Sequence, residues 1–259
     1  MQSAQQRVLI LGAYGGTGSA LARLLVSGGS QVFLAGRDSQ RLGYLADQLA
    51  MPHGLLDASN PDAIDAIADE AAATLGGLTG IANCVGSLLL KPAHLTSTAD
   101  WNATLAANLS SAFGCVRAAG RLLKAGAHGK ALDGSSEGGS VVLVSSAAAR
   151  VGLANHETIA AAKAGVIGLV LSAAATYARQ KIRFNAVAPG LVRTPLTKGL
   201  TSSELAEKAS VAMHPLGRLG EPEEVARVIA FLLDPAQSWI TAQVIGIDGG
   251  LADVRGRPS

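Results

Sequence analysis

The sequence carries little net charge and no dense cluster of one sign. Of its 259 residues, 21 are lysine or arginine and 19 are aspartate or glutamate, so the formal charge is only +2. The basic residues are scattered singly, whereas a nucleic-acid surface usually presents them in clusters. We therefore expect no nucleic-acid partner.

Cysteine is almost absent as well. Cys84 and Cys115 are the two cysteines of the chain, and both lie in apolar stretches. No second pair is present to build a disulfide framework or a metal site. The sequence therefore predicts a reducing compartment and no bound metal, with a single Cys84–Cys115 bridge as the alternative.

The sequence also lacks a hydrophobic run long enough to cross a membrane. Its longest uncharged apolar run, residues 164–178, is shorter than the ~20 residues that a spanning helix needs, and it contains Ser172 and Thr176. Residues 1–7 lead straight into an apolar strand, without the pattern of a secretory signal. We expect a cytoplasmic protein with no membrane partner, in which this run is a helix buried in the core or in a subunit contact.

What the sequence does contain is an alternation of short β-branched runs with longer stretches rich in alanine and leucine. This pattern is typical of βαβ units and a parallel sheet. The predicted strands are residues 7–11, 31–35, 80–82, 140–144, 183–187 and 244–247. The predicted helices are residues 19–27, 39–50, 61–75, 99–125, 160–179 and 222–233.

Hydrophobic residues make up 49% of the chain, which is enough to bury a large core. We expect one α/β domain over residues 1–259, a Rossmann fold with a doubly wound parallel sheet and helices on both faces. Residues 126–139 are rich in glycine and serine and lack periodicity, so they are predicted to form a surface loop.

A glycine-rich turn follows the first predicted strand and opens the first predicted helix. It contains Gly12, Tyr14, Gly15, Gly16, Thr17 and Gly18. Glycines in such a turn let the backbone approach a pyrophosphate, which then faces the amides of the helix N-terminus. An ordinary tight turn has the same composition, so the strand–turn–helix context carries the prediction of a dinucleotide site.

The end of the second predicted strand bears on the choice of dinucleotide. A carboxylate at position 36 would bind the ribose hydroxyls of NAD, but Gly36 and Arg37 stand there. An arginine can hold the 2′-phosphate of NADP through paired charged hydrogen bonds. We therefore expect NADP(H) to be favoured over NAD(H). Asp38 and the lack of a basic residue in the glycine turn keep NAD open, and a solvated Arg37 without a ligand is the alternative.

The glycine spacing, together with motifs further along the chain, resembles the short-chain dehydrogenase/reductase family, and in particular its 3-oxoacyl-acyl-carrier-protein reductases. The further motifs are Leu56-Asp57-Ala58, Asn83-Cys84-Val85-Gly86, residues 101–108, residues 185–194, residues 217–226 and residues 247–250. The resemblance extends from Val8 to Leu251, although Leu11 replaces the threonine that usually precedes the glycine turn. It implies a nicotinamide cofactor.

The resemblance also implies which residues contact that cofactor. In this family the acid at Asp57 accepts a hydrogen bond from the adenine amine, and the backbone of Val192 with the hydroxyl of Thr194 clasps the nicotinamide carboxamide. The full expected set is Gly12, Tyr14, Gly15, Gly16, Thr17, Gly18, Arg37, Asp57, Asn83, Gly86, Lys163, Pro189, Gly190, Val192 and Thr194.

The catalytic residues that the resemblance implies are incomplete. The family's reductases use a serine to polarise the carbonyl, a tyrosine to transfer the proton, a lysine four residues later, and an asparagine that holds a water. Ser146, Lys163 and Asn108 occupy three of these positions, but Ile159 stands where the tyrosine is expected. An isoleucine has no proton to transfer.

A second alignment of this stretch places a different acid. The family's enoyl-acyl-carrier-protein reductases carry their tyrosine seven residues before the lysine, and that position is His156. Histidine titrates near neutrality and can donate a proton. Ser146 and the Pro189–Gly190 pair belong instead to the carbonyl-reductase pattern. The expected proton source is therefore His156 or a water held by Asn108, Ser146 and Lys163, and a His156 that faces solvent or a subunit is the alternative.

These residues predict an NADP(H)-dependent oxidoreductase that reduces a carbonyl or an activated alkene. The segment 196–215, which is expected to cover the site as a lid, is rich in leucine, and this favours a small, partly apolar substrate. The alternatives are a catalytically inactive NADP(H)-binding subunit or sensor, and a different reaction on the same cofactor. The helix at 160–178 and the helix containing Cys115 resemble the surfaces through which family members form tetramers. We expect a homotetramer, or a mixed tetramer with an active relative.

Overall fold

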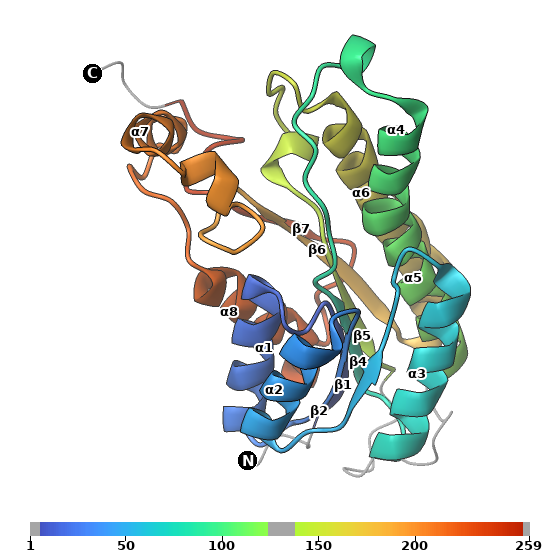
Figure 1. Ribbon diagram of the computed structural model, residues 1–259. Coiled ribbons are helices and arrows are strands. Elements are labelled where there is room, and N and C mark those ends of the chain that lie inside the picture. Colours follow the sequence, from blue (N-terminus) through green and yellow to red (C-terminus); the bar gives the residue numbers. More distant parts are fainter. Residues whose placement is uncertain (1–5, 124–137, 256–259) are drawn as a thin grey trace.

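One seven-stranded sheet organises the computed structural model, which describes residues 6–123 and 138–255 (Figure 1). Its strands are β1 (Arg7–Leu11), β2 (Gln31–Gly36), β3 (His53–Leu55), β4 (Gly80–Asn83), β5 (Ser140–Val144), β6 (Arg183–Pro189) and β7 (Val244–Ile247). They lie in the order β3-β2-β1-β4-β5-β6-β7, and every neighbouring pair is parallel. The chain winds outward from β1 in one direction and from β4 in the other, so the switch point between β1 and β4 is where a ligand site is expected.

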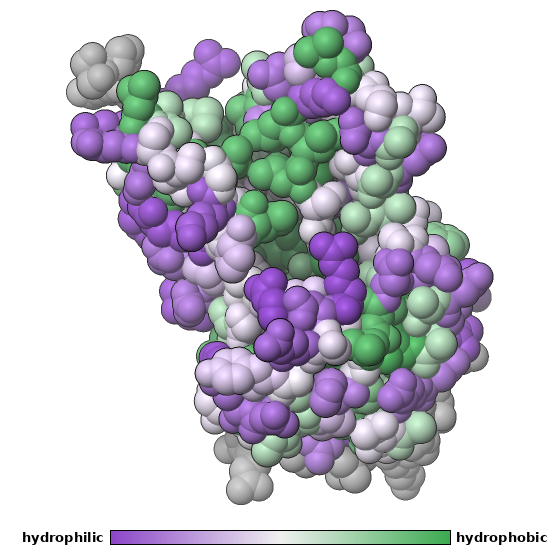
Figure 2. All heavy atoms as spheres, viewed as in Figure 1, coloured by the Kyte–Doolittle hydropathy of each residue, from purple (hydrophilic) through white to green (hydrophobic). Residues whose placement is uncertain are grey.

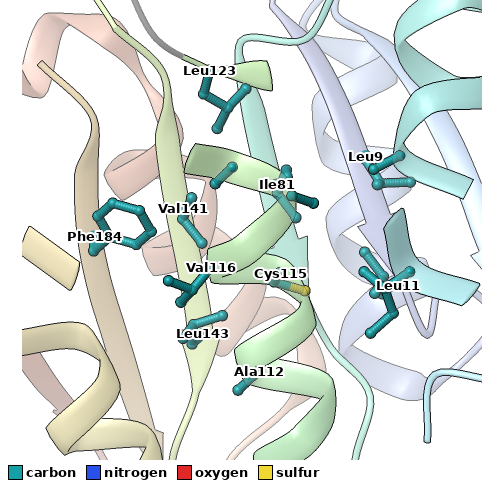
Figure 3. Close-up of a cluster of buried hydrophobic side chains, with 14 of the residues drawn as sticks. Leu9, Leu11, Ile81, Ala112, Cys115, Val116, Leu123, Val141, Leu143 and Phe184 are labelled. Carbon is teal, nitrogen blue, oxygen red and sulfur yellow. The ribbon is translucent and has the colours of Figure 1, made fainter. Parts of the chain in front are cut away.

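Side chains of β1 alternate between two hydrophobic cores, one on each face of the sheet. Leu9 and Leu11 belong to the first core, together with side chains such as Val141 and Phe184 (Figure 3). Val8 and Ile10 belong to the second core. The alternation follows from the two-residue period of a strand, and burial on both faces explains the continuous apolar runs in the sequence.

Helices cover both faces. Those against the second core are α1 (Gly16–Ser27), α2 (Ser39–Leu49) and α8 (Pro222–Leu233). Those on the opposite face are α3 (Pro61–Leu75), α4 (Thr98–Leu105), α5 (Ser111–Leu122) and α6 (Glu157–Tyr177). Several begin at the expected caps: Asn60 accepts a hydrogen bond from the amide of Asp62, and Pro61 occupies the first position of α3.

Helix α6 is apolar enough to raise the question of a membrane span. Together with the turn after it, residues Glu157–Gln180, it passes that test by length and composition. In the structure α6 packs against β6, α4 and α5, and its side chains Val166, Val170 and Ala173 enter the first core. Packing against the sheet and the neighbouring helices explains the apolar composition of this face.

The structure confirms the predicted α/β fold with a doubly wound parallel sheet and corrects several details. Strand β3 was not predicted, because His53 and Leu55 are exposed and leave no apolar run of strand length. The predicted helix at 99–125 is interrupted: α4 is followed by a π-helical turn (Ala106–Ser110) and then by α5. A further helix, α7 (Glu204–Ala212), lies inside the predicted lid. Most of the loop predicted at 126–139 lies outside the described residues.

Candidate active site

The predicted site residues gather at the carboxyl ends of the strands, where α/β sheets bind their ligands. They come from the ends of β1 to β6, from the π-helical turn between α4 and α5, and from the first half of α6. Figure 2 shows an apolar hollow at this edge, between the side that carries α7 and the side that carries α4 and α6.

The glycine turn after β1 is crowded by backbone. Gly12 has a φ of 71°, and a Cβ there would lie 2.9 Å from the backbone of Cys84 at the end of β4. A Cβ on Gly18 would lie 2.2 Å from the carbonyl oxygen of Gly12. Helix α1 begins after Gly15, with no side-chain cap and no acidic residue in its first turn. Its amide groups are therefore open to an anion, as a pyrophosphate site requires.

Tyr14 explains why position 36 is glycine. The Tyr14 ring lies across the end of β2, where a Cβ on Gly36 would come within 2.5 Å of it. The guanidinium of Arg41, on α2, lies 4.7 Å from the ring centroid, and Arg37, the first residue after β2, is exposed. Asp38 is occupied as the cap of α2, because its carboxylate accepts a hydrogen bond from the Arg41 amide at 3.0 Å. Two cations, Arg37 and Arg41, therefore border the expected ribose position, and the Asp38 carboxylate beside them gives its Oδ1 to the helix cap.

Asp57 and Asn83 lie close to this region. The hydroxyl and the amide of Ser59, with a smaller contribution from the charge of Arg37, hold the pKa of Asp57 below its ordinary value. Asp57 is thus an ionised acceptor. Asn83 is buried, and its amide group joins β4 to α5 through Ser111 at 3.1 Å while its oxygen accepts from the Val85 amide at 3.0 Å. Asn83 fixes the turn that leads to Gly86.

Lys163 is buried at the centre of the site. Its ammonium group donates to the carbonyl oxygen of Val144 at 2.8 Å, and the hydroxyl of Ser145 donates to the carbonyl oxygen of Lys163 at 2.8 Å. Burial lowers the pKa of Lys163 to about 8. Burial also raises the pKa of the neighbouring Cys84 thiol to about 12, so the thiol stays protonated.

Asn108 and Gly86 lie next to Lys163. A Cβ on Gly86 would be 3.1 Å from the side-chain oxygen of Asn108 and 3.5 Å from the Lys163 nitrogen. The Asn108 amide group donates to the carbonyl oxygen of Thr104 at 2.9 Å and to the hydroxyl of Ser87 at 3.0 Å. Asn108 belongs to the π-helical turn between α4 and α5, a distortion that is frequent at functional sites.

Ser146 and His156 lie at the two ends of the loop that joins β5 to α6. The Ser146 hydroxyl accepts from the Ala148 amide at 3.1 Å, which leaves its own proton free to donate. His156 precedes α6, and its Nδ1 lies 2.7 Å from the carbonyl oxygen of Ala154. Seven residues separate it from Lys163, about two helical turns or ~10 Å, so the two groups share a face without touching. Ile159, between them, is only 3% exposed.

Sequence reasoning missed His214, which joins the lid to the loop after β6. Its Nδ1 donates to the carbonyl oxygen of Ser210 at 2.8 Å, and its Nε2 accepts from the amide of Leu191 at 3.1 Å. A Cβ on Gly190 would lie 2.7 Å from the same Nε2. The sequence signal was a histidine just after a helical stretch, which has no specific meaning without the fold.

The loop after β6 also touches the glycine turn. The Thr194 methyl group lies so close to Gly16 that a Cβ there would be 2.7 Å away. Arg193 anchors the loop from the other side through ion pairs with Glu207 of α7 and with Glu221 before α8. The segment predicted to hold the pyrophosphate and the segment predicted to hold the nicotinamide are thus in contact.

Comparison with known proteins identifies the family to which the whole chain is similar. A family model described as enoyl-(acyl carrier protein) reductase matches residues 12–252. The chain is 36% identical to a cis-4-hydroxycyclohexanecarboxylate dehydrogenase of Sinomonas cyclohexanicum, over 97% of this chain and 98% of that one. It is 34% identical to a 3-oxoacyl-[acyl-carrier-protein] reductase of Thermotoga maritima, over 94% and 96%. A short-chain type dehydrogenase/reductase from Mycobacterium ulcerans superposes with a TM-score of 0.88 at 30% identity, over 98% and 92% of the two chains.

Proposed function

The chain belongs to the short-chain dehydrogenase/reductase family, oxidoreductases that bind nicotinamide cofactors, and from that premise we propose an NADP(H)-dependent oxidoreductase. Its proposed reaction is the reduction of the carbonyl or activated alkene of a small, partly apolar substrate. The observation that carries the proposal is the meeting of Gly86, Asn108 and Lys163 at the same sheet edge as the glycine turn.

The preference for NADP(H) rests on Arg37 and Arg41. An arginine fork matches the geometry of a phosphate better than that of a ribose hydroxyl. The Tyr14 ring supports Arg41 from below, and Gly36 supplies no carboxylate that would repel a phosphate. Asp38, the residue that kept NAD open, gives its Oδ1 to the cap of α2, which holds its carboxylate against that helix.

When bound, the nicotinamide supplies or accepts the hydride. Side chains of this chain would bind the substrate oxygen, the ribose and a water, and would supply the proton. Ser146 can donate its free hydroxyl proton to a substrate oxygen. Lys163 has two further N–H groups beyond the one held by Val144, and these suit a ribose hydroxyl and a water. The proton source proposed is that water, shared with Asn108, or else His156 at the outer end of the same helix face.

The substrate class is proposed from the apolar hollow. Exposed apolar side chains of the lid are Leu196, Leu205 and Met213. Ile159 adds an apolar wall where a tyrosine hydroxyl would stand. The relatives are named for a hydroxycyclohexanecarboxylate and for 3-oxoacyl groups, so cyclic ketones and 3-oxoacyl thioesters are the first substrates to try.

A catalytically inactive NADP(H)-binding subunit or sensor is the second candidate, and the buried Ile159 favours it. Either function is compatible with a cytoplasmic homotetramer, or with a mixed tetramer that includes an active relative. Helices α5 and α6 are the proposed contact surfaces, because Phe113 and Leu171 are 45% and 50% exposed on them.

The two candidates differ in one experiment. The protein is titrated with NADPH and NADH by fluorescence, and NADPH oxidation is then followed against cyclic ketones, 3-oxoacyl thioesters and enoyl thioesters. An oxidoreductase binds NADPH at least tenfold more tightly than NADH and turns over at least one of these substrates. A Lys163→Met variant is the matched control for background oxidation. NADPH binding without turnover in the whole panel would favour the binding subunit, and no binding of either cofactor would reject both.

A further inference from the structure

Thr197 lies in the turn after the carboxamide clasp, by which we mean the Val192 backbone and the Thr194 side chain. Its hydroxyl oxygen lies 2.5 Å from the carbonyl oxygen of Val192, 3.1 Å from the amide nitrogen of Thr194 and 3.0 Å from the hydroxyl oxygen of Thr194. One hydroxyl group therefore bonds to both members of the clasp. Thr197 also precedes a 3₁₀ turn (Lys198–Thr201), but its side chain makes no capping hydrogen bond there.

Counting protons fixes the direction of each of these hydrogen bonds. A threonine hydroxyl has one proton and two lone pairs. The Val192 carbonyl can only accept, and it is the nearest partner, so it receives the Thr197 proton. A weaker contact of the same hydroxyl at 3.2 Å also ends on a carbonyl, that of Thr194, and shares this proton.

Both lone pairs of Thr197 must then be filled by donors. The amide of Thr194 can only donate, so it takes one lone pair. The other lone pair faces the Thr194 hydroxyl, which must therefore donate its own proton to Thr197. Because its O–H points to Thr197 in that hydrogen bond, the Thr194 hydroxyl presents only lone pairs to the site.

The other member of the clasp, the Val192 backbone, offers a hydrogen-bond donor. Within residues 6–123 and 138–255, the amide N–H of Val192 has no hydrogen-bond acceptor. The clasp therefore offers one donor, from Val192, and one acceptor, from Thr194. A primary carboxamide presents a carbonyl oxygen and an NH₂ group, which match these two groups in order.

We infer that Thr197 is a positioning residue for cofactor specificity: it holds the Thr194 hydroxyl as an acceptor, so that the clasp selects a primary carboxamide over a group that lacks an N–H. This inference rests on the proposed nicotinamide site. It assigns to Thr197 a selection between cofactor head groups that neither Val192 nor Thr194 can make alone, because a free hydroxyl can turn to donate or to accept.

The test compares dissociation constants for three ligands. NADP⁺ carries the carboxamide, its 3-acetylpyridine analogue carries a methyl ketone without an N–H, and 2′-phospho-ADP-ribose has no nicotinamide. Wild type is expected to bind NADP⁺ about tenfold more tightly than the analogue, as one hydrogen bond allows. In Thr197→Val that ratio should fall to about one to threefold, because the Thr194 hydroxyl can turn and donate to the ketone.

Two controls separate orientation from folding. Thr197→Ser keeps the hydroxyl and should keep the wild-type ratio. Thr201→Val removes a hydroxyl from the same turn, whose one hydrogen bond among the described residues is to the Lys198 carbonyl at 3.5 Å, and it should also keep the ratio. Affinity for 2′-phospho-ADP-ribose should be equal in all variants. Thr197→Cys provides a second test, because its thiol takes the place of the hydroxyl but is only a weak donor and acceptor, so the ratio should fall as in Thr197→Val.

The inference is overturned if the ratio stays at the wild-type value in Thr197→Val or Thr197→Cys while 2′-phospho-ADP-ribose binds normally. It is also overturned if Thr201→Val lowers the ratio as much as Thr197→Val does. A wild-type protein that binds no NADP⁺ would overturn the proposed function and this inference together. Normal NADP⁺ binding with unchanged ratios would overturn only the role of Thr197.

Discussion

The cofactor side of the sheet edge and the proton-transfer corner around Lys163 are built from different parts of the chain. The glycine turn is shaped by backbone, since Gly12 and Gly18 leave no room for a Cβ. The corner around Lys163 depends on individual side chains, among them Asn108 and Ser146. A backbone-built site tolerates variation in its side chains, whereas a side-chain site changes its chemistry when one residue changes. Ile159 is such a change, whereas Leu11, the departure from the family pattern on the cofactor side, leaves the backbone of the glycine turn in place.

The largest expected effect comes from restoring the missing hydroxyl. If the corner is a carbonyl reductase without its acid, Ile159→Tyr should raise ketone reduction by the ~10²–10⁴-fold that a positioned general acid supplies. Ile159→Phe is the matched control, because it adds the ring without the proton. Turnover of one responsive ketone is the measurement. An equal gain in both variants would assign the effect to shape.

His156→Ala tests the other candidate proton donor, which lies just before α6. If His156 is the acid, this substitution should abolish a native activity without weakening NADPH binding, and Ile159→Tyr should help little. The four combinations of the two substitutions are assayed on one substrate. Activity that is untouched by His156→Ala would leave the water beside Asn108 and Lys163 as the proton source.

The buried Lys163 should make stability depend on pH. Its pKa falls from 10.5 to about 8 on folding, so between these values the unfolded chain binds more protons than the folded one. The free energy of unfolding of wild type therefore rises with pH across this window, by up to about 3 kcal/mol relative to Lys163→Met. Urea unfolding of both proteins at pH 7 and pH 10.5 measures the difference. If the free energies of unfolding of the two proteins change with pH in parallel, folding does not lower the pKa of Lys163.

On the cofactor side, Arg37→Ala should weaken NADPH by ~1.5–3 kcal/mol, as expected for the loss of charged hydrogen bonds, and leave NADH nearly unchanged. Arg41→Ala should act in the same direction. Arg23→Ala is the control, because that arginine bonds to Gln48 on the surface. If Arg37→Ala weakens the binding of NADPH and NADH equally, Arg37 has a structural role and does not contact the 2′-phosphate.

The smallest expected effect concerns His214. His214→Leu leaves the Leu191 amide without its acceptor and should weaken NADPH by about 1 kcal/mol. His214→Gln, which can accept from the same amide, should recover most of that loss. Binding of 2′-phospho-ADP-ribose should be unaffected, because the histidine lies on the nicotinamide side. A loss on both ligands would point to a fold effect instead.

The sequence predicts the features built from backbone better than it predicts the contacts between side chains. Backbone-built features have local signatures: β1 and β2 follow from their apolar runs, and α3 follows from Asn60 and Pro61 at its start. The role of His214 depends on its contact with Leu191, 23 residues away, which forms only when the lid folds back over the loop after β6. The contacts of Thr197 are local, but its three partners belong to an irregular turn that no periodic pattern in the sequence marks. The π-helical turn at Asn108 is equally silent in the sequence, because Ala106 and Ala107 favour an ordinary helix.

We propose above all that the site around Lys163 transfers hydride from NADPH to a substrate although Ile159 stands in place of the family's tyrosine. The most direct test of this proposal uses NADPH deuterated at the transferring position of the nicotinamide, incubated with a cyclic ketone or a 3-oxoacyl thioester and followed by mass spectrometry of the product. We expect one deuterium in each product molecule with wild type and none with Lys163→Met. NADPH that binds tightly but gives no deuterated product from any substrate of the panel would contradict it.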